Sequence, residues 1–185
     1  MKRIAAVVVM VHLGVAFVYA QGTPVKMKFW GSNVTSLLEL EPNTFTQEAL
    51  FDGKGSLGRF TYHELNAHNP VPQPSSTCSG VDYQFTKGAG VFGFKDGSLL
   101  TVEISKGDVC LDPVTLDAHL TVIYKITGGT GRFKDASGTL TSTSTGHPIL
   151  SAATRIEVVF FTNTGEFEGT VYGVDKEEEA QGEQQ

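Results

Sequence analysis

The feature that most constrains the fold of this chain is the alternation of apolar and polar residues in short runs. In one run, Leu100, Val102 and Ile104 alternate with Thr101 and Glu103. Other runs alternate in the same way, and residues that favour turns, such as glycine, proline, asparagine and aspartate, separate them. A period of two places one side of a strand against a core and the other side in solvent, so the sequence predicts an all-β protein.

Eight strands are predicted after residue 55, most of them with apolar side chains on one face. Eight short antiparallel strands suit a closed barrel or a sandwich, and closure removes the unpaired edges of a sheet. An eight-stranded barrel has room for its own side chains or for one small ligand. We therefore predict an eight-stranded antiparallel β-barrel. The predicted strands are 56–66, 80–87, 89–95, 98–105, 117–127, 136–144, 153–162 and 166–174.

The first twenty residues are predicted to be a secretory signal peptide. Lys2 and Arg3 precede an apolar run, and Val18-Tyr19-Ala20 suits cleavage before Gln21. We therefore expect the protein to be secreted or periplasmic, with no stable membrane anchor after cleavage.

The rest of the chain is expected to have three parts. Residues 21–55 are an N-terminal extension, in which the run VKMKFW is a candidate extra strand, and residues 56–174 form the barrel domain. Residues 175–185 form an acidic tail that is predicted to be disordered. The extension also contains the glycosylation sequon Asn33-Val34-Thr35. A proline-rich loop over 67–79 is expected to form a rim or lid.

The charge of the chain argues against two classes of partner. The formal net charge is −6, and loss of Lys2 and Arg3 with the signal peptide brings it to −8. Nucleic acids and anionic membranes are bound chiefly through basic patches, so neither is an expected partner.

The two cysteines, Cys78 and Cys110, have a spacing that fits neither a redox motif nor a zinc cluster. In an exported chain an even pair indicates a disulfide, with two separate thiols as the alternative.

Residues 60–70, with the sequence FTYHELNAHNP, bring a carboxylate, two asparagines and two histidines close together. His63 and His68 suggest the zinc motif HExxH, but they are five positions apart where that motif needs four, so no metal is expected. The segment GKGSLG at 53–58 spells the dinucleotide fingerprint GxGxxG, yet a strand-like segment follows it where a helix is required. No cofactor is expected.

A glycine-rich segment carries a family resemblance. YKITGGTGRFKDASGTLT, residues 124–141, resembles the strand–turn–strand motif shared by plant allene oxide cyclases and dirigent proteins, two families with an eight-stranded antiparallel barrel. TYHELN, residues 61–66, resembles the first barrel strand of the cyclases. The resemblance covers 56–174 and implies that this strand opens the barrel and that the glycine-rich turn follows the fifth strand. Independently of the resemblance, three glycines in four residues indicate a tight turn, which Phe133 is expected to plug against the core. The predicted signal peptide is dirigent-like, because the plant cyclases carry plastid transit peptides.

The resemblance also implies roles for individual residues. Glu64 falls on the pocket glutamate of the cyclases, and Asn66 falls on an asparagine that holds a water near the substrate epoxide. The cyclases have a second asparagine after a Phe-Thr pair on the next strand, where this chain has Lys87. That departure puts the cyclase reaction in doubt. The resemblance further implies a homotrimer.

Two functions are therefore expected, with a surface or interaction module as a third. The first is a secreted barrel that binds a small hydrophobic ligand without catalysis. The second is a cyclase-like isomerase or a dirigent-type stereoselective guide, in which Glu64 stabilises positive charge in a site of low dielectric. A barrel filled by its own side chains is the alternative to a ligand cavity. The residues expected to line the cavity are Phe60, Tyr62, Tyr83, Phe85, Phe92, Val102, Tyr124 and Phe160.

Overall fold

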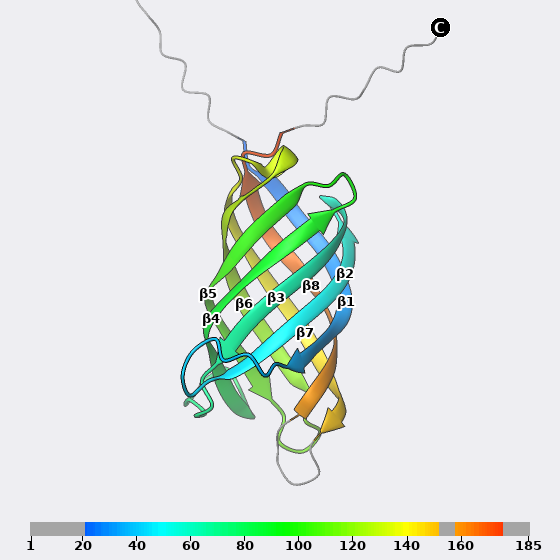
Figure 1. The fold of residues 1–185 in the computed structure, drawn as a ribbon. Coiled ribbons are helices and arrows are strands. Elements are labelled where there is room, and N and C mark those ends of the chain that lie inside the picture. Colours follow the sequence, from blue (N-terminus) through cyan, green and yellow to red (C-terminus); the bar gives the residue numbers. More distant parts are fainter. Residues whose placement is uncertain (1–20, 152–157, 176–185) are drawn as a thin grey trace, which may run out of the picture.

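The computed structural model of the chain is a closed barrel of eight strands, each antiparallel to its neighbours and arranged in sequence order (Figure 1). The structure describes residues 21–151 and 158–175, so the predicted signal peptide and nearly all of the acidic tail lie outside the described residues. No helix within the described ranges is long and apolar enough to cross a membrane. The elements are β1 Thr23–Thr35, β2 Phe45–Gly55, β3 Gly58–His68, β4 Val81–Phe94, β5 Leu99–Leu111, β6 Ala118–Gly129, η1 Gly131–Phe133, β7 Ser137–Ser151 and β8 Val158–Tyr172.

The fold class and the number of strands are as predicted, but the residues that supply the strands differ. The expected N-terminal extension, 21–55, provides β1 and β2, and β1 closes the barrel by pairing with both β2 and β8. TYHELN consequently lies in the third strand, where the resemblance implied the first, and the glycine-rich turn follows the sixth. A barrel starting at residue 56 would lack two strands and expose two edges.

Two pairs of predicted strands are single strands. The segments 80–87 and 89–95 form β4, and residues 158–162 and 166–172 of the other two predicted strands belong to β8, while 153–157 lie outside the described residues. Asn163-Thr164-Gly165, which separates the predicted strands 153–162 and 166–174, continues β8 and pairs with β1 and β7. Gly88 and Gly165 lie at these two errors and face the barrel interior, where a Cβ would meet Ile104 Cδ1 at 2.5 Å and Phe29 Cζ at 2.7 Å, respectively. A Cβ at Gly90 would lie 2.3 Å from the Tyr62 hydroxyl oxygen.

The two ends of the barrel differ. The turn end carries the short connections β2–β3 and β4–β5, the glycine-rich turn, the start of β1 and the end of β8 (Figure 1). The loop end carries the longer connections 36–44, 69–80 and 112–117. The main core occupies the half nearer the turn end, where Tyr62, Phe92 and Phe167 are fully buried and their ring centroids lie 4.4–5.3 Å apart.

The glycine-rich turn closes the turn end. Gly131 has a φ of 57°, a left-handed conformation that favours glycine. Phe133 is fully buried, as predicted, and packs on Phe94 with ring centroids 4.8 Å apart. The guanidinium of Arg132 lies over both rings, donates a hydrogen bond to the Leu57 carbonyl at 2.7 Å and forms an ion pair with Asp96. These contacts join three connections of the barrel at one end.

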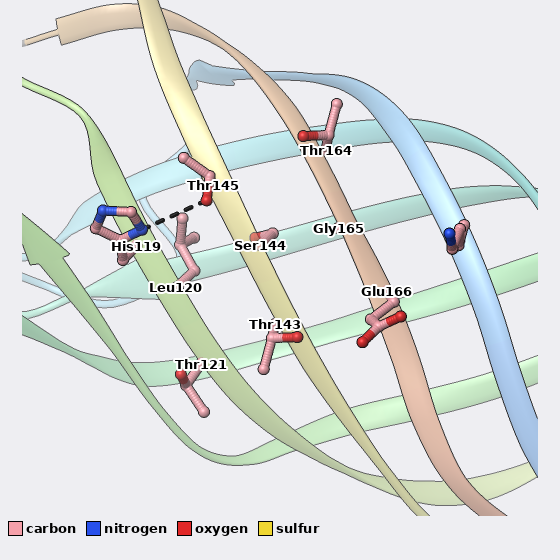
Figure 2. A pocket seen from close by; sticks show the side chains of 10 residues that line it. His119, Leu120, Thr121, Thr143, Ser144, Thr145, Thr164, Gly165 and Glu166 are labelled. Atoms are coloured by element: carbon pink, nitrogen blue, oxygen red, sulfur yellow. Dashed lines mark hydrogen bonds between the residues drawn. The ribbon is translucent and has the colours of Figure 1, made fainter.

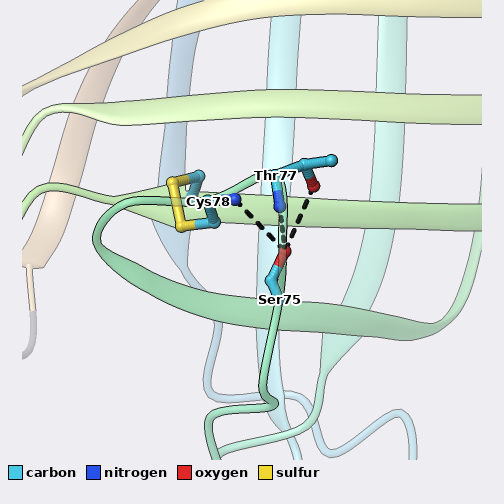
Figure 3. Close-up of a disulfide and its surroundings, with 4 residues drawn as sticks. Ser75, Thr77 and Cys78 are labelled. Carbon is cyan, nitrogen blue, oxygen red and sulfur yellow. Dashed lines mark hydrogen bonds between the residues drawn. A yellow bond between two sulfur atoms is a disulfide. The ribbon is translucent and has the colours of Figure 1, made fainter.

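The predicted disulfide between Cys78 and Cys110 is confirmed, with the two Cα atoms 5.4 Å apart (Figure 3). Cys110 lies on the outer side of β5, directly opposite Asp82 of β4. The loop 69–80 also forms a bridge from Gln73 to Asp82, with the Gln73 amide donating to the Asp82 carbonyl at 2.9 Å. The bond therefore attaches the proline-rich loop to the outside of the barrel at the loop end.

Replacing both cysteines by serine is expected to lower the free energy of unfolding by about 3–4 kcal/mol, because a cross-link over 32 residues reduces the entropy of the unfolded chain. Urea unfolding under non-reducing conditions measures the change, with Ser76→Ala in the same loop as the control. A loss below about 1 kcal/mol would contradict the prediction.

Candidate functional site

The inward face of β3 carries most of the candidate site. Its alternation places Phe60, Tyr62, Glu64, Asn66 and His68 inside the barrel, in order from the turn end to the loop end. All five are buried, and Glu64 retains only 8% of its accessible surface. The interior therefore changes along one strand from an aromatic core to polar groups.

The Glu64 carboxylate accepts three side-chain hydrogen bonds. Tyr62 and Tyr124 donate their hydroxyls to Oε2, the latter at 2.7 Å, and Asn66 donates its amide to Oε1 at 2.6 Å. Tyr124 comes from β6, so its bond to Glu64 crosses the interior from the other side of the barrel. Both residues expected to be catalytic thus face inward and bond to each other, which the strand pattern of TYHELN predicts.

Burial dominates the electrostatics of this cluster. Desolvation raises the pKa of the Glu64 carboxyl, against the lowering effect of hydrogen bonds from Tyr62, Tyr124 and Asn66. Desolvation, followed by the charge of Glu64, raises the pKa of the Tyr62 and Tyr124 hydroxyls well above the usual value. The tyrosines therefore stay protonated at neutral pH and act as donors to the carboxylate.

Two buried polar atoms of β3 have no hydrogen-bond partner within the described protein: Asn66 Oδ1 and His68 Nε2. Asn66 must present its amide nitrogen to the carboxylate, which leaves the oxygen free. The His68 ring packs on Phe85 with centroids 4.1 Å apart, and burial lowers the pKa of His68 to about 4. His68 is therefore neutral at physiological pH. Its buried, inward position was not predicted, since it sits where the strand pattern gives way to proline.

A second group of buried amides lies on neighbouring strands and escaped the sequence analysis. Asn163 of β8 donates to Asn33 Oδ1 at 2.7 Å, and Asn33 of β1 donates to Gln47 Oε1 at 2.7 Å. Gln47 of β2 lies directly opposite Asn66. This amide row was missed because β1 and β2 were assigned to an extension. Asn33 is the sequon asparagine, and its burial inside the barrel leaves no access for glycosylation of the folded protein.

The residues expected to line a ligand cavity fall into three groups. Phe60, Tyr62, Phe92, Val102 and Tyr124 belong to the main core, where they are almost completely buried against one another. Phe85 is partly buried beside that core, and Tyr83 packs in a second apolar cluster near the loop end.

The prediction that Phe160 faces inward is wrong. Phe160 lies opposite Val34, an exposed residue of β1, whereas Phe161 lies opposite Asn33 and packs in the second apolar cluster. With two adjacent phenylalanines, the sequence does not show which one faces the barrel interior. The pairing of β8 with β1 decides that it is Phe161.

The departure from the cyclase pattern on the next strand is visible in the structure. Lys87 is exposed, and the register between β3 and β4 shifts next to it. Gly88 takes the inward position opposite Asn66, and a Cβ there would lie 2.9 Å from the Asn66 Cβ. Strand β4 therefore contributes no second amide, and the interior amides besides Asn66 come from β1, β2 and β8.

The outer surface carries a further hollow and a polar cluster. An open groove of about 470 Å³ crosses β6, β7, β8 and β1, with His119, Thr143, Thr145 and Glu166 along it (Figure 2). His119 is exposed and contacts the Thr145 hydroxyl.

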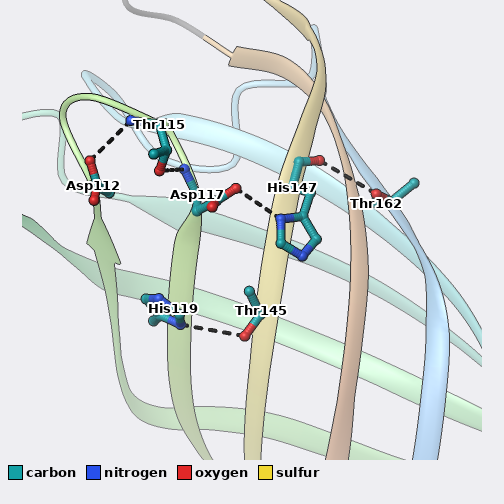
Figure 4. Close-up of polar contacts among 7 residues, drawn as sticks. All are labelled: Asp112, Thr115, Asp117, His119, Thr145, His147 and Thr162. Carbon is teal, nitrogen blue, oxygen red and sulfur yellow. Dashed lines mark hydrogen bonds and ion pairs between the residues drawn. The ribbon is translucent and has the colours of Figure 1, made fainter.

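At the loop end, His147 pairs with Asp117 at 2.8 Å, and the Asp112 carboxylate accepts backbone bonds within the loop 112–117 (Figure 4). No group of three or more histidine, cysteine, aspartate or glutamate residues among the described residues is placed to hold a metal ion.

No protein-family model and no curated protein sequence matches this chain. Among solved structures, the chain is similar to the pterocarpan synthase dirigent protein PsPTS1, with 14% sequence identity and a TM-score of 0.44. The alignment covers 84% of this chain and 97% of that protein. Dirigent proteins are one of the two families that the glycine-rich motif resembles. At this identity no residue role passes from one protein to the other.

The neutral state of His68 is expected to make stability depend on pH. Its folded pKa, about 4, lies below the usual 6.5, so the unfolded chain binds the proton more readily and stability is lost as pH falls from 6.5 towards 4. Over that interval, the free energy of unfolding of the wild type, measured with urea, should fall by up to about 3 kcal/mol more than that of His68→Asn.

Glu64 acts in the opposite direction, because its raised pKa favours the folded state as pH falls, but this contribution is common to both proteins. Parallel pH profiles of the two proteins would contradict a buried neutral histidine.

Proposed function

We propose that the barrel binds a small, mostly apolar molecule with one polar group, in the half of its interior nearer the loop end. The observation that carries the proposal is the pair of buried atoms without a partner, Asn66 Oδ1 and His68 Nε2. A buried polar atom without a hydrogen bond costs about 1–3 kcal/mol, so a ligand that satisfies both atoms would gain affinity from them.

The apolar part of such a ligand has a matching surface. The second apolar cluster contains Leu111, Ala118 and Phe161, with partly buried Tyr83, Val109 and Leu120 packed against it. Tyr83, Val109 and Leu120 lie directly opposite one another on β4, β5 and β6, on the side of each strand that faces inward. Partly exposed apolar groups on an inward face are typical of a ligand site.

Neutral His68 supplies either a donor or an acceptor at Nε2, depending on its tautomer, and Asn66 Oδ1 supplies an acceptor. A hydroxyl group matches this pair best, because it donates and accepts at once. We therefore place an alcohol or an enol ahead of an acid, since a carboxylate would meet the buried charge of Glu64.

Export of the protein is part of the proposal. The disulfide fits an oxidising compartment, and the sequence before Gln21 has the features of a signal peptide. The homotrimer implied by the family resemblance stays a prediction.

Ligand binding is tested with dodecanol and dodecane as probes in native mass spectrometry. Dodecanol is expected to bind more tightly than dodecane, and Asn66→Leu should weaken dodecanol binding about 5–10-fold, as the loss of one hydrogen bond implies. Leu120→Trp should abolish binding by filling the interior, whereas Thr121→Trp, the next and outward residue of β6, should not. Equal binding to both tryptophan variants, or no binding by wild type, would refute the interior site.

A catalytic role for Glu64 is the second candidate, favoured by the burial of its carboxylate beside two tyrosine hydroxyls. Such a carboxylate is suited to stabilise positive charge on an opening epoxide. However, three donors already occupy it, so the substrate would have to displace at least one of them.

If the protein is a cyclase, it should accelerate cyclisation of an unsaturated fatty-acid epoxide, and Glu64→Gln should abolish turnover while leaving dodecanol binding within about twofold. Chiral chromatography of the products measures both rate and stereochemistry. Turnover no faster than the spontaneous reaction in wild type would eliminate this candidate and leave the binding function.

A further inference from the structure

A row of three cations crosses the outside of the barrel near the turn end. Lys28 of β1 lies directly opposite Lys54 of β2, and Lys54 lies directly opposite Arg59 of β3. All three side chains are exposed. Adjacent strands are about 4.8 Å apart, so the row spans roughly 10 Å.

Lys28 also lies directly opposite Glu166 of β8, but none of the three cations is held in an ion pair within the described residues. Lys26, beside them on β1, is instead paired with Glu166 and Glu168 of β8. Like charges directly opposite each other on adjacent strands are destabilising. Lys54 lies between two cations on its neighbouring strands, in a chain whose formal net charge is −6.

The row lies beside a hollow in the surface. An open groove of about 480 Å³ is lined by Lys26, Lys28, Lys54 and Arg59, together with Gly55 and Gly58 of the β2–β3 hairpin. Because the two glycines have no side chains, the surface between the cations is low. The groove lies on the convex outer side of the barrel. A thin, linear, negatively charged molecule can follow this convex surface more closely than a flat, wide partner can.

We propose that Lys28, Lys54 and Arg59 bind an acidic polysaccharide, through carboxylate or sulfate groups that repeat along the chain. The length of the row matches two or three sugar units. The flanking acids Glu166, Glu168 and Asp52 would repel a wider polyanion such as duplex DNA or an anionic bilayer. This surface is independent of the proposed interior site, which lies nearer the other end of the molecule.

Binding to immobilised heparin and polygalacturonate tests the proposal, with dextran as the uncharged polymer. The full mature protein is expected to bind one or both acidic polymers at 50 mM salt and to lose at least tenfold in affinity at 500 mM, because screening shortens the reach of exposed charges. Lys54→Gln with Arg59→Gln should lower affinity at least tenfold and leave the thermal midpoint equal or higher, since a like-charge pair is removed.

Lys125→Gln is the matched control, because Lys125 is exposed on β6 and paired with Glu103. It should bind like wild type. The proposal is overturned if the double variant binds as well as wild type, if dextran binds equally, or if duplex DNA or phosphatidylserine vesicles bind more tightly than both acidic polysaccharides. None of these outcomes bears on dodecanol binding, which tests the interior separately.

Discussion

Barrel closure through β1 is the constraint on which the rest of the structure depends. A strand paired on both sides has no free edge, and β1 pairs with β2 along nine positions and with β8 along twelve. Closure turns one face of every strand into an enclosed interior. Only then can Glu64 on β3 meet Tyr124 on β6, and Asn163 on β8 meet Asn33 on β1. An open sheet would leave the same polar side chains in water.

The interior is divided along the barrel axis, and the division explains why the site lies where it does. Near the turn end, aromatic rings fill the space completely and glycines such as Gly90 accommodate them. A carboxylate placed next to this core loses its hydration and requires donors, which the two tyrosines and Asn66 supply. Beyond them the interior becomes partly polar and less completely packed. The aromatic half thus gives stability, and the polar half is where we propose that a ligand binds.

Patterns within single segments were predictable because they depend on neighbouring residues alone. The two-residue period of TYHELN placed Glu64 and Asn66 on one face, and three closely spaced glycines indicated the tight turn that Phe133 plugs. Strand boundaries were less predictable. Glycine breaks an isolated strand, but Gly88, Gly90 and Gly165 continue strands here because side chains of other strands occupy the space above them, such as Ile104 at Gly88 and the Tyr62 ring at Gly90. That space exists only after distant segments have come together.

The sequence alone determined that the chain is all-β, that eight strands would form a barrel, that two cysteines would join, and that a carboxylate would share a face with aromatic residues. The tertiary structure decided which segments form the strands, which of two adjacent phenylalanines faces inward, and which amides meet inside. It also decided that Lys28, Lys54 and Arg59 form a row. The reason is physical: strand period is a property of successive residues, whereas register, closure and the meeting of side chains depend on hydrogen bonds between strands that the sequence holds far apart.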